Sequence, residues 1–111
     1  MKNILIGLMF AFCFLVAQAG TTSGTIQYID IRQSDGLIYF MINGVNAGRP
    51  ACAVMPYWML GNINNNTPTV KQQLALLMQA AATGKMVNIT GKGICGLWSD
   101  GEDVNDVQLV M

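Results

Sequence analysis

Apolar and polar residues alternate over several short segments of the chain, which indicates half-buried β-strands, whereas residues 37–43 and 51–55 are short apolar runs. The near-continuous run at 37–43 suggests burial on both faces or contact with a partner. We expect strands at residues 25–32, 37–43, 51–55, 85–90 and 104–111. The first two are rich in β-branched and aromatic residues. Asp35-Gly36 between them, and Asp100-Gly101 before the last strand, are dipeptides that accept the positive φ of a tight turn.

One segment has helical periodicity instead. Thr67 can cap a helix whose first position is Pro68, and Gly84 is a suitable end. Thr69 with Gln72 is an alternative capping box one register later. The expected apolar stripe consists of Val70, Leu74, Leu77, Met78 and Ala81.

The predicted element order is therefore β-β-β-α-β-β. It indicates a β-rich α+β domain. Five short strands with a helix between the third and fourth is the order of the five-stranded barrel called the OB-fold. A plain sheet with the helix on one face is the alternative.

Residues 1–19 have the pattern of a secretory signal peptide. Lys2 is followed by an uncharged apolar run at 4–17, and Ala17-Gln18-Ala19 is a small-x-small cleavage motif. We expect cleavage after Ala19, with an uncleaved membrane anchor as the alternative. The expected product is one domain, residues 20–111, secreted or periplasmic in a bacterium and without a membrane span. Its first residues, 20–24, are expected to form a polar leader.

Two cysteines, Cys52 and Cys95, remain after this cleavage. Paired cysteines in an oxidising compartment usually form a disulfide. Closing a loop of this length stabilises a domain by about 4 kcal/mol in the chain-entropy model. A metal site is a weaker interpretation, since two thiols without histidine make at most half a zinc site.

Charge and composition narrow the function classes. The chain has 6 basic and 6 acidic residues and no histidine, and loss of Lys2 leaves 5 basic residues. Nucleic-acid binding needs a basic surface, so it is not expected. Without histidine there is no Ser-His or Cys-His pair. We expect a non-enzymatic protein with no catalytic residues, no cofactor and no metal.

An acidic stretch near the C-terminus could argue against that view. Asp100, Glu102, Asp103 and Asp106 are close in sequence and could hold calcium or act as paired carboxylates of a hydrolase. The EF-hand spacing is missing. We therefore favour a solvated turn that leads into the last strand.

The two tryptophans are better candidates for binding. Indole rings stack on sugars and anchor protein interfaces. Trp98 is followed by polar Ser99 and Asp100 in a predicted loop, so these three form the expected binding site. Trp58 lies among apolar neighbours, which favours the core or a subunit interface.

The C-terminal part of the chain resembles a group of small exported bacterial proteins. The resemblance is carried by Gly84-Lys85, Val87, Ile89, Gly91, Gly93, Cys95, Trp98, Val104 and Val107, together with Cys52. It is to the B subunit of subtilase cytotoxin and its relatives among the AB5 toxins. This resemblance implies an OB-fold, an export signal, a disulfide and a pentamer that binds cell-surface glycans. It identifies no sugar-contacting residue.

We therefore expect an exported, oligomeric, glycan-binding module like a toxin B subunit. The alternative is a periplasmic structural or inhibitor protein that acts by protein–protein contact. In that case residues 37–42 and 57–60 would form the interface.

Overall fold

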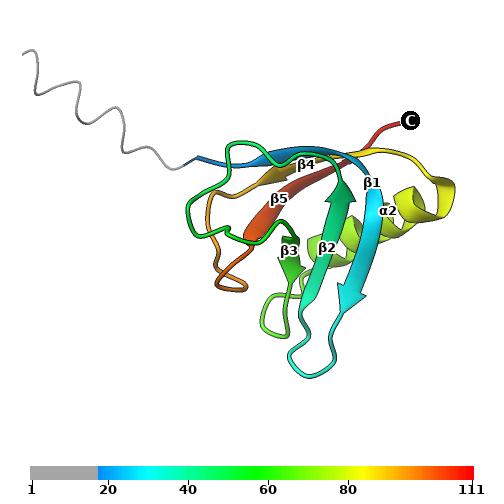
Figure 1. Cartoon of the computed structure of the whole chain (residues 1–111). Coiled ribbons are helices and arrows are strands. Elements are labelled where there is room, and N and C mark those ends of the chain that lie inside the picture. The colour runs from blue at the N-terminus through cyan, green and yellow to red at the C-terminus, as the bar shows by residue number, and fades with distance from the viewer. Residues whose placement is uncertain (1–17) are drawn as a thin grey trace, which may run out of the picture.

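The computed structural model describes residues 18–111. The predicted signal peptide lies outside the described residues, apart from Gln18 and Ala19. The described residues form five strands and one helix in the order β-β-β-α-β-β (Figure 1), which confirms the predicted order and the β-rich α+β class. The elements are β1 (Thr21–Ile31), β2 (Ile38–Asn43), β3 (Trp58–Gly61), α2 (Pro68–Thr83), β4 (Val87–Gly91) and β5 (Glu102–Leu109).

The strands are hydrogen-bonded in the order β1-β2-β3-β5-β4. β4 pairs back on β1, so this circuit of neighbours is closed. β3 and β5 are parallel, and every other pair is antiparallel. Each strand therefore has two neighbours, but the pairing covers only parts of β1 and β2: residues 25–31 pair with β2 alone, and β2 pairs with β3 only at residues 38–40.

β1 links the two halves of this circuit. Thr21–Gly24 pairs with β4, and the segment from Thr25 to Ile31 pairs with β2. At the change of partner, a side chain on Gly24 would collide with the carbonyl of Asn43, so only glycine permits this close approach. The prediction of a polar leader at 20–24 is wrong, because its backbone groups are used in strand pairing.

The third strand also differs from the prediction. Residues 51–55 form turns rather than a strand, and β3 begins at Trp58. All four residues of β3 are buried, as expected of a strand covered on both faces. The segment 51–55 lies between Pro50 and Pro56, which lack the N–H that a strand ladder requires.

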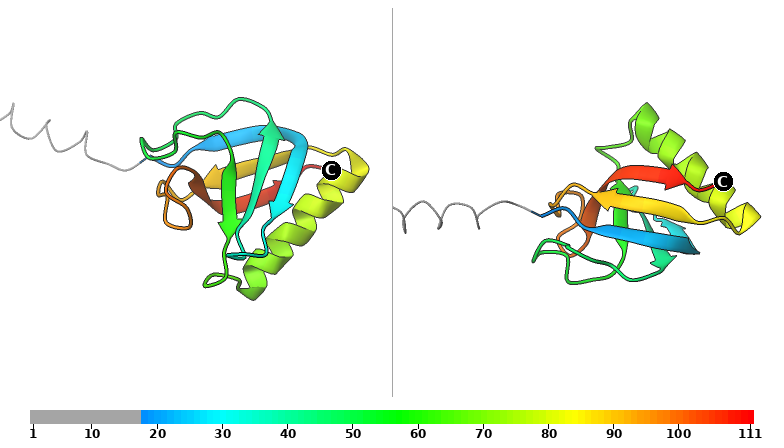
Figure 2. Two further views of the ribbon diagram at one scale, coloured as in Figure 1. Left: turned by 60° about the horizontal axis from the view of Figure 1, so that its bottom comes forward. Right: turned by 90° about the horizontal axis from the view of Figure 1, so that it is seen from above.

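The helix begins and ends as predicted. Thr67 Oγ1 accepts a hydrogen bond from the Val70 N–H at 3.3 Å, and Gly84 adopts a left-handed conformation with φ of 67°. The buried stripe is narrower than expected and consists of Val70, Leu77 and Ala80. Met78 and Ala81 are exposed. Figure 2 shows α2 crossing one end of the strand assembly, where it contacts β1, β3 and β5.

The core lies inside the circuit of strands and under α2. Its largest members, Phe40 and Trp58, are fully buried. Around them pack buried aliphatic side chains from β2, β3, α2, β4 and β5: Ile38, Ile42, Leu60, Val70, Leu77, Val87, Ile89, Val104 and Val107. From β1, the partly buried Ile26 and Ile29 pack against this cluster. Within residues 18–111, no helix has the length and hydrophobicity that crossing a membrane requires.

The predicted disulfide between Cys52 and Cys95 is present, with the two Cα atoms 6.2 Å apart. It joins the β2–β3 connection to the β4–β5 loop, which are 43 residues apart in sequence. Such a bond is compatible with an oxidising extracellular or periplasmic compartment.

Replacing both cysteines by serine (Cys52→Ser with Cys95→Ser) should destabilise the domain. Chain entropy predicts a loss of about 4 kcal/mol, because the unfolded chain is no longer cross-linked. Urea unfolding of the oxidised protein and of the double variant measures this difference. The reduced wild-type protein is the matched control and should unfold like the variant. A loss below about 1 kcal/mol would contradict the assigned role of the bond.

Candidate functional site

Trp98 lies in the β4–β5 loop with 41% of its surface exposed. The guanidinium of Arg32, at the end of β1, lies over its ring at 5.0 Å from the ring centroid. Asp35 holds Arg32 through two hydrogen bonds, from Nε at 3.1 Å and from Nη2 at 2.6 Å. The β1–β2 turn and the β4–β5 loop therefore meet at this indole.

Two hollows adjoin Trp98, and both are lined by Trp98 and Leu37. The larger, of about 180 Å³, is lined in addition by Asp35, Asn62, Ile63, Asn64 and Leu97. The smaller, of about 50 Å³, is lined in addition by Arg32, Tyr39, Tyr57 and Met59. An exposed aromatic ring thus stands between two concave surfaces that carry carboxylate, amide and guanidinium groups.

A row of three tyrosines continues the smaller hollow. The rings of Tyr28 and Tyr39 meet edge to face with centroids 6.3 Å apart. Those of Tyr39 and Tyr57 are 5.3 Å apart and tilted by 56°. The Tyr39 hydroxyl donates to Asp30 Oδ2 at 2.9 Å, and this hydrogen bond raises the pKa of Tyr39. The row crosses β1 and β2 and ends just before β3.

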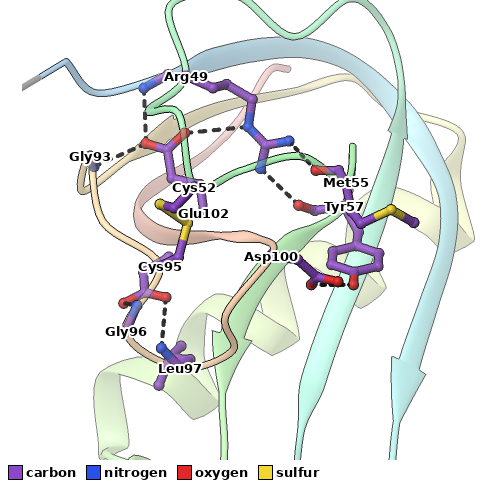
Figure 3. Close-up of a disulfide and its surroundings, with 12 residues drawn as sticks. Arg49, Cys52, Met55, Tyr57, Gly93, Cys95, Gly96, Leu97, Asp100 and Glu102 are labelled. Carbon is purple, nitrogen blue, oxygen red and sulfur yellow. Dashed lines mark hydrogen bonds and ion pairs between the residues drawn. A yellow bond between two sulfur atoms is a disulfide. The ribbon is translucent and has the colours of Figure 1, made fainter.

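Tyr57, the last tyrosine of this row, and the nearby Met55 hold Asp100 in place. The Tyr57 hydroxyl donates a hydrogen bond to Asp100 Oδ1, and the backbone carbonyl of Asp100 accepts one from Met55 N. Desolvation is the main cause that raises the pKa of Tyr57 to about 12, and the Asp100 carboxylate adds to it. Tyr57 is therefore a neutral donor throughout the physiological pH range. Figure 3 shows its ring beside Asp100.

The structure brings together part of the site that the sequence predicts. Trp98 and Asp100 lie at the ends of a short turn, and Ser99 is exposed between them. Sequence reasoning missed Arg32 and Tyr57, which contact Trp98 and Asp100 respectively from other segments. The Arg32-x-x-Asp35 spacing in a tight turn is the one local signal that could have indicated an ordered guanidinium.

The apolar segments considered for a protein interface are core segments instead. Four of the residues at 37–42 are buried: Leu37, Ile38, Phe40 and Ile42. Trp58, Met59 and Leu60 are buried as well, so Trp58 belongs to the core. Tyr39, Met41 and Tyr57 are the half-buried members, so only a small part of these two segments reaches the surface.

The acidic stretch is not a solvated turn, which corrects the prediction. Glu102 is fully buried and Asp103 is 5% exposed. Figure 3 shows the Glu102 carboxylate between Arg49 and Gly93. Its Oε1 accepts from Arg49 Nε at 3.3 Å. Its Oε2 accepts from the N–H of Gly93 at 3.0 Å and that of Gly20 at 2.9 Å.

The Asp103 carboxylate also accepts hydrogen bonds from backbone groups. Its Oδ2 accepts from the N–H of Gly96 at 3.1 Å, and its Oδ1 accepts from the N–H of Leu97 at 3.0 Å. Both carboxylates therefore have structural partners. In the part of the chain that the structure describes, no three cysteine or acidic side chains lie close enough together to hold a metal ion.

A third hollow, of about 270 Å³, is larger than the two beside Trp98 and lies between the start of α2 and β5. It is lined by Leu60, Asn65, Thr67, Thr69, Val70, Gln73, Lys92, Val104 and Asn105. No aromatic ring is among these residues, so nothing there can stack on a planar or cyclic ligand. The Trp98 region is the better candidate on chemical grounds, although its hollows are smaller.

No protein-family model matches this chain, and neither the curated proteins nor the solved structures contain a match.

The Tyr57–Asp100 contact predicts a delayed tyrosine titration. Tyr57 should ionise near pH 12, against 10 for an unperturbed tyrosine, and Asp100→Asn should lower its pKa while leaving the contribution of burial. Because the folded-state pKa is raised, the stabilisation from Tyr57 is complete below pH 10 and is lost as the pH rises towards 12.

Ultraviolet difference spectroscopy of the wild type and Asp100→Asn measures this titration. Tyr57→Phe is the control that identifies the step, since it removes this tyrosine alone. A Tyr57 that ionises near pH 10 in the folded wild type would contradict the assigned contact.

Proposed function

We propose that this protein is a non-enzymatic, exported binding module that recognises a glycan at Trp98. The observation that carries the proposal is the exposed indole between two hollows, held by residues from two different loops. Large aromatic side chains are mostly buried in proteins, whereas Trp98 keeps 41% of its surface exposed. A ring kept in the open and steadied by Arg32 is suited to stack on the apolar face of a sugar.

We infer further that the fold is a barrel of the OB type. Support comes from the closed strand order, the parallel β3–β5 pair and the helix between β3 and β4. OB-folds bind oligosaccharides or oligonucleotides on strands 2 and 3 and on the loops that follow strands 1 and 4. In this chain those same places supply Tyr39, Met59, Arg32 and Trp98.

The polar groups around the indole favour a sugar over a nucleic acid. Asp35, Asn62 and Asn64 line the larger hollow and can accept or donate hydrogen bonds to hydroxyl groups. Arg32 is the one cation among the lining residues, and it is already paired with Asp35. Both hollows are smaller than the roughly 300–1,000 Å³ typical of drug-sized ligands. We therefore propose that one terminal sugar residue is bound.

Export through a cleaved signal peptide belongs to the same proposal. It places the module where glycans of a cell surface are accessible and where the disulfide can form. The resemblance to toxin B subunits supports it from the sequence side. It also extends the proposal to a homo-oligomer, because avidity from several linked sites makes weak sugar binding effective.

Trp98→Ala should weaken glycan binding by about tenfold or more, equivalent to about 1.4 kcal/mol. The loss arises because the stacking surface is removed while the hollows keep their polar groups. Binding of the oxidised mature protein to an array of cell-surface glycans identifies a ligand, and calorimetry with that ligand measures the change.

Met78→Ala is the matched control, because Met78 is an exposed apolar side chain on α2 that lines neither hollow. It should bind as the wild type does. Unchanged affinity of Trp98→Ala would place the binding site elsewhere. A wild-type protein that binds no glycan at all would overturn the proposed ligand class.

Light scattering after size exclusion tests the oligomer. A mass near five protomers is the result expected from the resemblance to toxin B subunits. A monomer would remove the pentamer from the proposal and favour a module that acts by protein contact.

A further inference from the structure

A backbone nitrogen near the start of the described chain points into a buried anionic site. The N atom of Gly20 lies 2.9 Å from Oε2 of Glu102, a fully buried carboxylate. The carbonyl of Gly20 also accepts a hydrogen bond from Gly91 N at 2.9 Å. Gly20 is therefore anchored on both sides of its Cα, although it comes before β1.

The site is shaped for a residue without a side chain. A Cβ on Gly20 would lie 2.5 Å from both Glu102 Oε1 and Arg49 Cγ. A Cβ on Gly91 would collide with the Glu102 carboxylate, so this neighbour must be glycine as well. The carboxylate thus occupies space that the absent side chains leave free.

The boundary between exposed and buried chain coincides with the predicted cleavage point. Gln18 and Ala19 are exposed, and Gly20 is the first buried residue of the part of the chain that the structure describes. The small-x-small motif predicts cleavage of the Ala19–Gly20 bond. Hydrolysis of that bond adds OH from water to the Ala19 carbonyl and H to the Gly20 nitrogen. Near neutral pH the new amine takes up a proton and the new carboxyl group releases one.

We propose that Glu102 is the binding site for the α-ammonium group that processing creates on Gly20. Before cleavage, Oε2 accepts a neutral amide N–H from this position. After cleavage, the same nitrogen carries a positive charge and three donors at the same place. The new contact is a charge-assisted hydrogen bond, which is roughly twice as strong as a neutral one.

The Glu102 carboxylate already pairs with one cation, Arg49, and has room for the ammonium group of Gly20 as a second. Glu102 and Arg49 are the charged side chains that border Gly20. Arg49 uses Nε for Oε1, and its other nitrogens donate to the carbonyls of Met55 and Tyr57. Oε2 is left to the N–H groups of Gly20 and Gly93. The ammonium group therefore adds to the Arg49 contact without displacing it.

On this proposal, cleavage after Ala19 stabilises the folded domain. The mature chain, starting at Gly20, should be more stable than a chain that keeps Ala19. Its α-amine should also be protected from reagents, whereas the amine of the longer chain lies in solvent with Ala19. Proteolysis after Ala19 would then contribute to folding of the exported domain as well as releasing it.

The test compares two oxidised chains, one starting at Gly20 and one starting at Ala19, each as wild type and as Glu102→Gln. Intact mass of the exported protein first establishes the natural start. The rate of α-amine acylation should be at least tenfold lower for the Gly20 chain than for the Ala19 chain. Its Tm should be higher by roughly 4–8 °C, the size of one such contact in a small domain.

In the Glu102→Gln pair both differences should be smaller, because the neutral amide keeps a hydrogen-bond acceptor but has no charge to pair with the ammonium group. This pair is the matched control for any steric effect of the extra residue. If Glu102→Gln does not fold, the comparison of the two wild-type chains, starting at Gly20 and at Ala19, still tests the proposal. Equal Tm and equal amine reactivity in that pair would overturn the proposal, and so would a natural start at any residue other than Gly20.

Discussion

The buried carboxylate of Glu102 is the constraint on which much of this structure depends. A charge without solvent must be paired and hydrogen-bonded, and breaking such a pair costs about 3–5 kcal/mol. Its partners come from three separate segments: Gly20 ahead of β1, Arg49 in the β2–β3 connection and Gly93 in the β4–β5 loop. One side chain at the start of β5 therefore holds together the end of the molecule at which these segments meet.

Arg49 connects Glu102 to residues that lie nearer the candidate site. Its guanidinium covers the ring of Trp58 at 4.3 Å and donates to the carbonyl of Tyr57 at 2.8 Å. Tyr57 in turn donates its hydroxyl to Asp100, two residues from Trp98. The buried ion pair is thus linked through Tyr57 to Asp100, which lies in the same loop as Trp98. Burial lowers the pKa of Arg49, and the Glu102 carboxylate opposes that shift and so favours the charged form.

The features that the sequence predicts well are local ones. The Thr67 cap, the Gly84 end and the Asp35-Gly36 turn depend on residues a few positions apart, and all three are present. Burial of Glu102 depends on residues 53 and 82 positions away, which no local pattern records. The same reason explains the error at 20–24, whereas at 51–55 the flanking Pro50 and Pro56 are a local signal against a strand. Trp98 could be proposed from its polar neighbours, but its contact with Arg32 required the fold.

Two residues of the acidic stretch, Glu102 and Asp103, hold in place the loop that carries Trp98. Successive residues of a strand point to opposite faces, so Glu102 and Asp103 leave β5 in opposite directions. Glu102 accepts from Gly93, on one side of Cys95 in the sequence, whereas Asp103 accepts from Gly96 and Leu97 on the other. The disulfide fixes the residue between them. Three independent ties thus hold the loop just before the exposed indole of Trp98.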